Sequence, residues 1–125
     1  MAHTISERQI RMFWRRVGQE ELRRTEPQRR RATIEAKIAV AAFNVRARSA
    51  HPVLAWPTFL AAVLSERPFL MVECVSCGQI ACVDLRKIGY HLDASINALT
   101  PYLKCMRCQP DPPSPRLFGL RKCRL

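Results

Sequence analysis

Two short segments decide the fold of this chain: Cys74-Val75-Ser76-Cys77 and Cys105-Met106-Arg107-Cys108. Two residues between the cysteines of each pair let one turn direct both sulfurs at a single point. Two such turns supply the four thiolates of a closed, structural zinc site. The sequence therefore predicts one Zn²⁺ ion, bound by Cys74, Cys77, Cys105 and Cys108. The alternative, four unrelated buried thiols, is disfavoured because the C-x2-C spacing occurs twice.

The composition favours a globular protein with a polyanionic partner. The chain has 125 residues, 48% of them hydrophobic, and a formal net charge of +11. This length allows one domain, or a small metal module with a helical segment. Residues 1–48 hold 12 Lys and Arg against 5 acidic residues, so the positive charge lies mainly in the N-terminal part. DNA, RNA or an anionic membrane surface would suit such a charge, and a solvated arginine-rich surface is the alternative.

The sequence gives no sign of a membrane segment. Residues 1–11 lack the apolar core of a secretory signal. The longest apolar stretch, residues 53–64, contains Pro57 and is too short to span a bilayer. We expect a cytoplasmic protein, because C-x2-C pairs bind metal in a reducing compartment and do not form disulfides.

Three helices are predicted before the first cysteine pair. A capping box from Thr4 to Glu7 predicts a first helix over residues 5–24. Pro27 is placed to begin a second helix that ends near Arg48, and a short third helix is expected over residues 58–65. The apolar face of the first helix holds Ile10, Phe13, Trp14 and Val17; four arginines occupy the opposite face: Arg8, Arg11, Arg15 and Arg16.

The second helix is apolar on two sides, and we expect both sides to be covered. One side carries Ile34, Ile38, Ala41 and Val45; the other carries Ala32, Ala36, Val40, Phe43 and Ala47. The first and third helices, a second copy or a partner protein could supply the cover. We name Val40 and Phe43 as the candidates for an interface.

The remaining chain predicts a small β module. Strands are expected over residues 69–72 and 79–85, followed by a helix that Asp93 caps and Pro101 ends. An extended linker over residues 110–115, a strand over residues 116–120 and a loose C-terminus complete it. The prediction is thus an α+β chain, with a basic helical region (1–67) and a metal-binding module (68–125).

The stretch from Cys74 to about Leu120 resembles the zinc-ribbon class, in which a knuckle, a hairpin, a second knuckle and a closing strand surround the metal. More narrowly, it is similar to small uncharacterised bacterial proteins with a Cys-x2-Cys-Gly strand pair and a second Cys-x2-Cys. The resemblance implies zinc and contact with nucleic acid or protein. The chain departs from this pattern in the 27 residues between the knuckles and in Gln109, which stands where a glycine often follows the second pair.

The other cysteines and His91 are not expected to bind the metal. We interpret Cys82 as a core residue and Cys123 as an incidental surface thiol, and His91 adds nothing to four cysteine ligands. No phosphate loop, His-Glu-x-x-His or Gly-x-Ser-x-Gly motif is present, so we expect no enzyme.

Two hypotheses about function follow. In the first, the protein is a nucleic-acid-associated accessory protein, and arginines bind the phosphate backbone: Arg8, Arg11, Arg15, Arg16, Arg29, Arg30 and Arg31. In the second, it is an adaptor or assembly subunit that uses the second helix to bind another copy or another protein.

Overall fold

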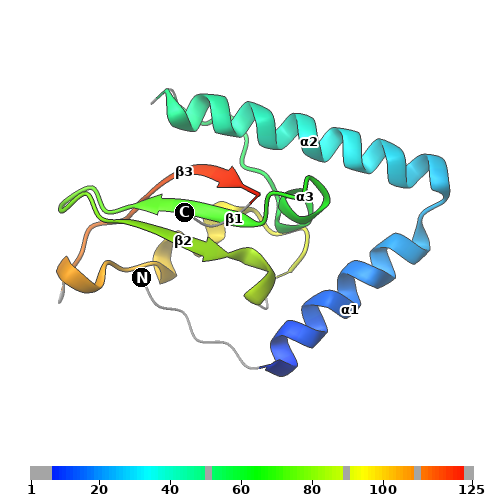
Figure 1. Ribbon diagram of the computed structural model, residues 1–125, viewed down its shortest axis with the longest axis horizontal. Coiled ribbons are helices and arrows are strands. Elements are labelled where there is room, and N and C mark those ends of the chain that lie inside the picture. Colours follow the sequence, from blue (N-terminus) through cyan, green and yellow to red (C-terminus); the bar gives the residue numbers. More distant parts are fainter. Residues whose placement is uncertain (1–6, 50–51, 89–90, 109–110, 123–125) are drawn as a thin grey trace.

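A computed structural model of the chain describes residues 7–49, 52–88, 91–108 and 111–122. Helices precede a small three-stranded antiparallel sheet, so the predicted α+β class is confirmed (Figure 1). The helices are α1 (Glu7–Arg23), α2 (Glu26–Arg48) and α3 (Phe59–Leu64). The strands are β1 (Phe69–Glu73), β2 (Ile80–Asp84) and β3 (Arg116–Arg121). Three short 3-10 helices complete the order: η1 (Leu85–Lys87), η2 (Ile96–Tyr102) and η3 (Met106–Cys108).

The start of α2 is specified by a capping box between Thr25 and Gln28, in addition to the expected Pro27. The Thr25 hydroxyl accepts a hydrogen bond from Gln28 N (3.4 Å), and Gln28 Oε1 accepts one from Thr25 N (2.9 Å). Pro27 lies in the first turn, where a missing N–H leaves no helical bond unmade. The capping box predicted from Thr4 involves residues outside the described set.

The helix α2 is buried on one side only, so the prediction of two covered sides is wrong for the single chain. Val40 and Phe43 are 1% exposed, whereas Ile34, Ile38 and Val45 are 57%, 64% and 68% exposed. The buried side packs on α3 and β3, while α1 turns away from α2 and contacts η1 (Figure 1). As a correction, Val40 and Phe43 belong to the core and present no surface for a partner.

The strand β1 is the centre of the sheet, whose order is β2-β1-β3. Its residues 69–72 are all buried, as expected for a central strand covered on both faces. One hydrophobic cluster contains Val40 and Phe43 from α2, Leu70 from β1 and Leu120 from β3. The core therefore crosses the boundary that we expected between residues 67 and 68.

The helix predicted between the knuckles is instead the 3-10 helix η2. Its cap is Ser95, whose hydroxyl accepts a hydrogen bond from Asn97 N (3.1 Å), and Asp93 is exposed. Ile96 and Leu99 anchor η2 in the core. After it, the segment 111–115 has no regular structure and leads into β3, as predicted. No helix in the described ranges is both long and apolar enough to cross a membrane.

Candidate metal centre

The first cysteine pair lies on the turn that joins β1 to β2. Cys74 N donates to Gln79 O (2.9 Å), and Gly78 N donates to Cys74 O (2.8 Å). Gly78, which directly follows Cys77, has a φ of 76°, in the left-handed region that glycine adopts without strain. These bonds fold the turn back on itself, so that Cys74 and Cys77 face the same point.

The second pair lies on the short helix η3, at the end of the sheet away from α1 (Figure 1). Cys108 N donates to Cys105 O (3.4 Å), which closes the turn. The buried side chain of Leu103 anchors the preceding chain in the core. Gln109, where the sequence suggested a looser turn, is outside the described residues.

The four sulfurs converge as a metal site requires. The ligand atoms of Cys74, Cys77, Cys105 and Cys108 all lie within 4.8 Å of one another. The Sγ atoms of Cys74 and Cys108 are 3.7 Å apart, and those of Cys77 and Cys105 are 3.6 Å apart. A tetrahedron with metal–sulfur bonds of about 2.3 Å has edges of about 3.8 Å. The donor set therefore fits a single ion at the centre of the cluster.

Hydrogen bonds shift the pKa values of two of the four thiols in opposite directions. The N–H of Cys77 is the main cause that lowers the pKa of the Cys74 thiol from 9.0 to about 6, and desolvation opposes it. The contact with the Cys74 sulfur raises the pKa of the Cys108 thiol to about 12. A cation must displace the remaining protons in order to bind four thiolates, so binding is coupled to proton release.

The surroundings make this a closed site. Cys74 and Cys105 are buried, Cys108 is half-buried and Cys77 is exposed. The Cys105 thiol donates to Gln79 Oε1 at 3.5 Å, so the Gln79 amide stands next to the ligand set. Four protein sulfurs leave a tetrahedral ion no open position for substrate or water. The chemistry of such an ion is structural.

The other candidate ligands do not join the cluster. Among the described residues, neither Cys82 nor His91 belongs to the group of four. Cys82 is half-buried in β2, opposite Met71 of β1, and His91 is exposed. Cys123 lies outside the described residues.

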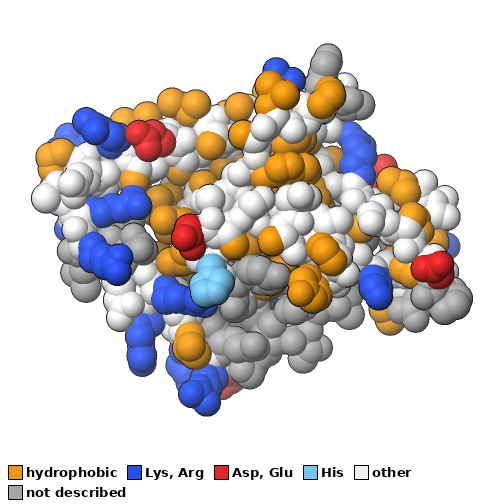
Figure 2. Space-filling model, turned by 180° about the vertical axis from the view of Figure 1, so that it is seen from behind, with side chains coloured by type: hydrophobic (Ala, Val, Ile, Leu, Met, Phe, Trp, Pro, Cys, Tyr) orange, Lys and Arg blue, Asp and Glu red, His pale blue; other side chains and the backbone are white. Residues whose placement is uncertain are grey.

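The arginines named from the sequence differ in exposure and in their partners. Arg8, Arg11, Arg15 and Arg31 are exposed. Arg16 is half-buried, and its Nε is removed from solvent with no hydrogen-bond partner among the described residues. Arg29 and Arg30 lie 4.0 and 3.8 Å from Glu26 carboxylate oxygens, so their charges are partly compensated. In Figure 2, Lys and Arg side chains gather on the side of the molecule where α1 lies.

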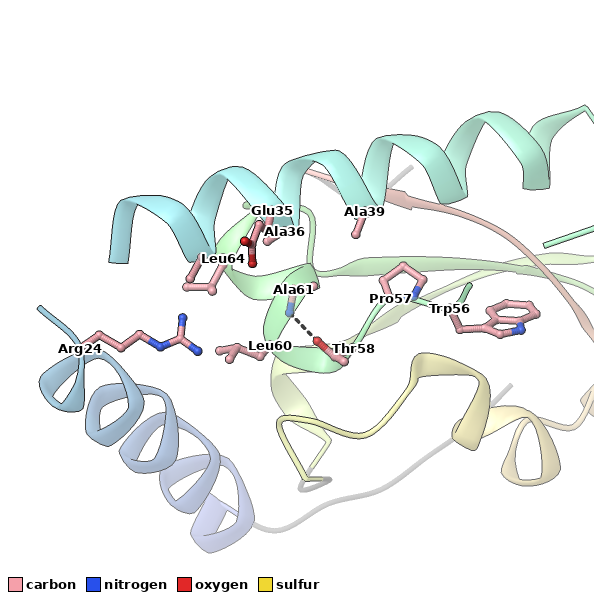
Figure 3. A pocket seen from close by; sticks show the side chains of 11 residues that line it. Arg24, Glu35, Ala36, Ala39, Trp56, Pro57, Thr58, Leu60, Ala61 and Leu64 are labelled. Carbon is pink, nitrogen blue, oxygen red and sulfur yellow. Dashed lines mark hydrogen bonds between the residues drawn. The ribbon is translucent and has the colours of Figure 1, made fainter. Parts of the chain in front are cut away.

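A cleft lies between the C-terminal end of α1 on one side and the helices α2 and α3 on the other (Figure 3). The sequence did not suggest it. It has a volume of about 280 Å³, and its lining is mostly apolar, including Trp56, Leu60 and Leu64. Arg24 and Glu35 contribute its charged side chains. The Thr58 hydroxyl, which also lines the cleft, accepts a hydrogen bond from Ala61 N (3.0 Å) at the start of α3.

Comparison with known proteins identifies no relative of this chain. No family model, curated protein or solved structure matches it. The resemblance to zinc ribbons thus stays a prediction, and the fold and the cysteine cluster are the basis for a functional conclusion.

Proposed function

We propose that the cysteine cluster binds one structural Zn²⁺ ion and that residues 68–125 form a module of the zinc-ribbon type. The four-sulfur donor set supports zinc, because thiolates select soft or borderline metals and a tetrahedral arrangement suits zinc. The order of strand, knuckle, strand, knuckle and closing strand supports the ribbon. Metal analysis of reduced protein tests the proposal, with one zinc per chain as the expected result.

We further propose that the protein is a nucleic-acid-associated accessory protein, not an enzyme, and that it acts in the reducing cytoplasm. One observation carries this proposal: three exposed arginines of α1, Arg8, Arg11 and Arg15, have no ion-pair or hydrogen-bond partner for their side chains among the described residues. Unpaired guanidinium groups along one helix can each contact a phosphate in bidentate fashion.

This arrangement favours phosphate contacts over recognition of bases. The exposed α1 arginines follow one helix face and have no aromatic platform between them, apart from the partly exposed Trp14. Binding of DNA or RNA should therefore depend weakly on sequence. It should fall steeply as salt rises, because each neutralised phosphate releases counterions.

The test compares two double variants of equal charge. Arg11→Gln/Arg15→Gln should weaken binding of unrelated DNA and RNA oligonucleotides and flatten the dependence on salt. The control, Arg48→Gln/Arg121→Gln, removes two exposed arginines from α2 and β3 and should have the smaller effect. Equal effects of the two variants, or no binding by the wild type at low salt, would contradict this function.

The adaptor role is the second candidate, and the exposed side of α2 favours it. Ile34, Ile38 and Val45 are each more than half exposed, and the exposed Ala41 lies between them. This spacing places four apolar side chains in one stripe, the pattern by which helices pack on one another. A second copy of the chain or another protein would cover the stripe.

A further inference from the structure

A small hollow lies where the middle of α2, the link between α3 and β1, and the end of β3 come together. In Figure 1 the tip of β3 lies next to α3 and below α2, and β3 pairs there with the start of β1. The hollow has a volume of about 280 Å³. Six residues line it: Lys37, Ala41, Ser65, Glu66, Arg67 and Lys122.

Three cations from separate segments meet in this hollow. Lys37 comes from α2, Arg67 from the link before β1, and Lys122 from the residue after β3. No hydrogen bond or ion pair involves these three side chains within the described part of the chain. Like charges held together repel one another, and an anion between them would relieve the repulsion.

The backbone at Arg67 is fixed by the way in which α3 ends. Glu66 N donates to Val63 O and Arg67 N donates to Ala62 O, both at 3.0 Å, which is the bond pattern of a Schellman motif. Glu66 takes the left-handed position of this motif with a φ of 60°, where glycine is usual. The half-buried Arg67 therefore extends its guanidinium from a rigid backbone.

The single acid of the hollow does not neutralise it. Glu66 is exposed, and no ion pair joins it to the three cations. With three positive charges and one negative charge, the hollow keeps an excess of two positive charges. This excess matches the charge of a phosphate monoester near neutral pH, which is about −1.5 to −2.

We propose that this hollow binds a phosphate group. Arg67 supplies a planar fork for two phosphate oxygens, and Lys37 and Lys122 supply point charges. The volume lies at the lower limit for ligand pockets, which suits a phosphate group more than a whole nucleotide. The group can belong to a small phosphate ester or to a nucleic-acid backbone. The site uses none of the α1 arginines and stands independently of the function proposed for them.

The probe for the test is inorganic phosphate, followed through the backbone amide NMR signals of Arg67 and Lys122. Wild-type protein should bind with a Kd on the order of millimolar. Arg67→Gln/Lys122→Gln should weaken binding by about tenfold or more, since two charge-assisted hydrogen bonds are lost. The matched control Arg48→Gln/Arg121→Gln should stay within about twofold, because both side chains are exposed and neither lines the hollow.

Glu66→Gln should change the phosphate affinity in the opposite direction. A gain in affinity cannot come from loss of folding, so this variant keeps the test valid if the double variant is unstable. Removing the carboxylate should tighten phosphate binding several-fold, because a like charge next to the anion is removed. The proposal is overturned if Glu66→Gln weakens binding, if both double variants lose affinity equally, or if the wild type shows no saturable shift.

The source of the phosphate is distinguished by a parallel titration with an oligonucleotide. If Arg67→Gln/Lys122→Gln weakens the binding of both inorganic phosphate and the oligonucleotide, the hollow contacts the nucleic-acid backbone. If the variant weakens only the binding of inorganic phosphate, the hollow binds a small phosphate ester. Loss of oligonucleotide binding in Arg11→Gln/Arg15→Gln with intact phosphate binding would separate the hollow from the α1 surface.

Discussion

Asn44 of α2 forms two hydrogen bonds with the backbone of Leu120 in β3. Asn44 Nδ2 donates to Leu120 O (3.0 Å), and Leu120 N donates to Asn44 Oδ1 (2.7 Å). Because β3 is an edge strand, these bonds satisfy backbone groups that no neighbouring strand reaches. One side chain thereby joins the helical part of the fold to the sheet.

We expect Asn44→Ala to destabilise the protein by about 2 kcal/mol, because the backbone groups of the buried Leu120 lose their partner. Alanine favours the helix over asparagine, so helix propensity works against the loss and cannot cause it. Urea unfolding measures the change. Asn97→Ala is the control, since Asn97 is exposed, and its effect should stay within about 0.5 kcal/mol. Equal stabilities of the two variants would show that Asn44 does not hold β3.

Local signals in the sequence predicted most elements and the four cysteines that cluster. The C-x2-C spacing and Gly78 specify the knuckle through bonds between near neighbours, so the sequence alone contains the information. The Thr25-x-x-Gln28 capping box is equally local, although Pro27 alone was used to predict the start of α2. Its pattern of a Ser or Thr followed three residues later by Glu or Gln could have located the start of α2.

Tertiary packing determined what the sequence could not show. Both sides of α2 carry large apolar residues, and periodicity alone does not say which side faces the sheet. The answer depends on the path of α1, which contacts η1 and leaves Ile38 exposed. The role of Asn44 also depends on the fold. Its partner Leu120 is 76 residues away, and only the fold brings the two together.

Gly78→Ala should weaken the metal module through its backbone alone. A side chain at a φ of 76° costs about 1–2 kcal/mol, while an added Cβ would meet no atom within 4 Å. The loss should appear as a several-fold weaker zinc affinity in competition with a chelator, since metal binding and folding are linked. Gly18→Ala is the control. Gly18 lies in α1 with open space around it and alanine favours a helix, so this change should raise the free energy of unfolding and not weaken zinc binding. Unchanged zinc affinity in Gly78→Ala would contradict the role of this turn.

Serine at Cys74, Cys77, Cys105 or Cys108 should remove the metal and unfold residues 68–125, because a structural metal supplies folding free energy. Zinc content per chain and circular dichroism with and without a chelator measure both effects. Cys82→Ser and Cys123→Ser should keep one zinc per chain. Loss of zinc from either would mean that the ligand set is different.

Affinity for the metal should depend on the Gln79 side chain, which lies 3.5 Å from the Cys105 sulfur. Residues that contact metal ligands orient them, and their loss typically weakens binding by about 10- to 100-fold. We therefore expect Gln79→Ala to weaken zinc binding while leaving the ratio of one ion per chain unchanged. Asn97→Ala serves again as the control, and equal affinities of the two variants would count against this role.

The exposed side of α2 gives the test that separates the adaptor role from the nucleic-acid role. Ile38 is 64% exposed, so Ile38→Asp should change the free energy of unfolding by about 1 kcal/mol or less and keep zinc bound. Phe43, which packs on Trp56 with ring centroids 5.5 Å apart, is fully enclosed, so Phe43→Asp should unfold the protein.

Light scattering at several concentrations measures self-association. If the wild type is an oligomer and folded Ile38→Asp is a monomer, the stripe is an interface between copies. If the wild type is a monomer and Ile38→Asp retains full affinity for nucleic acid, self-association through α2 is excluded and nucleic-acid binding is independent of this stripe.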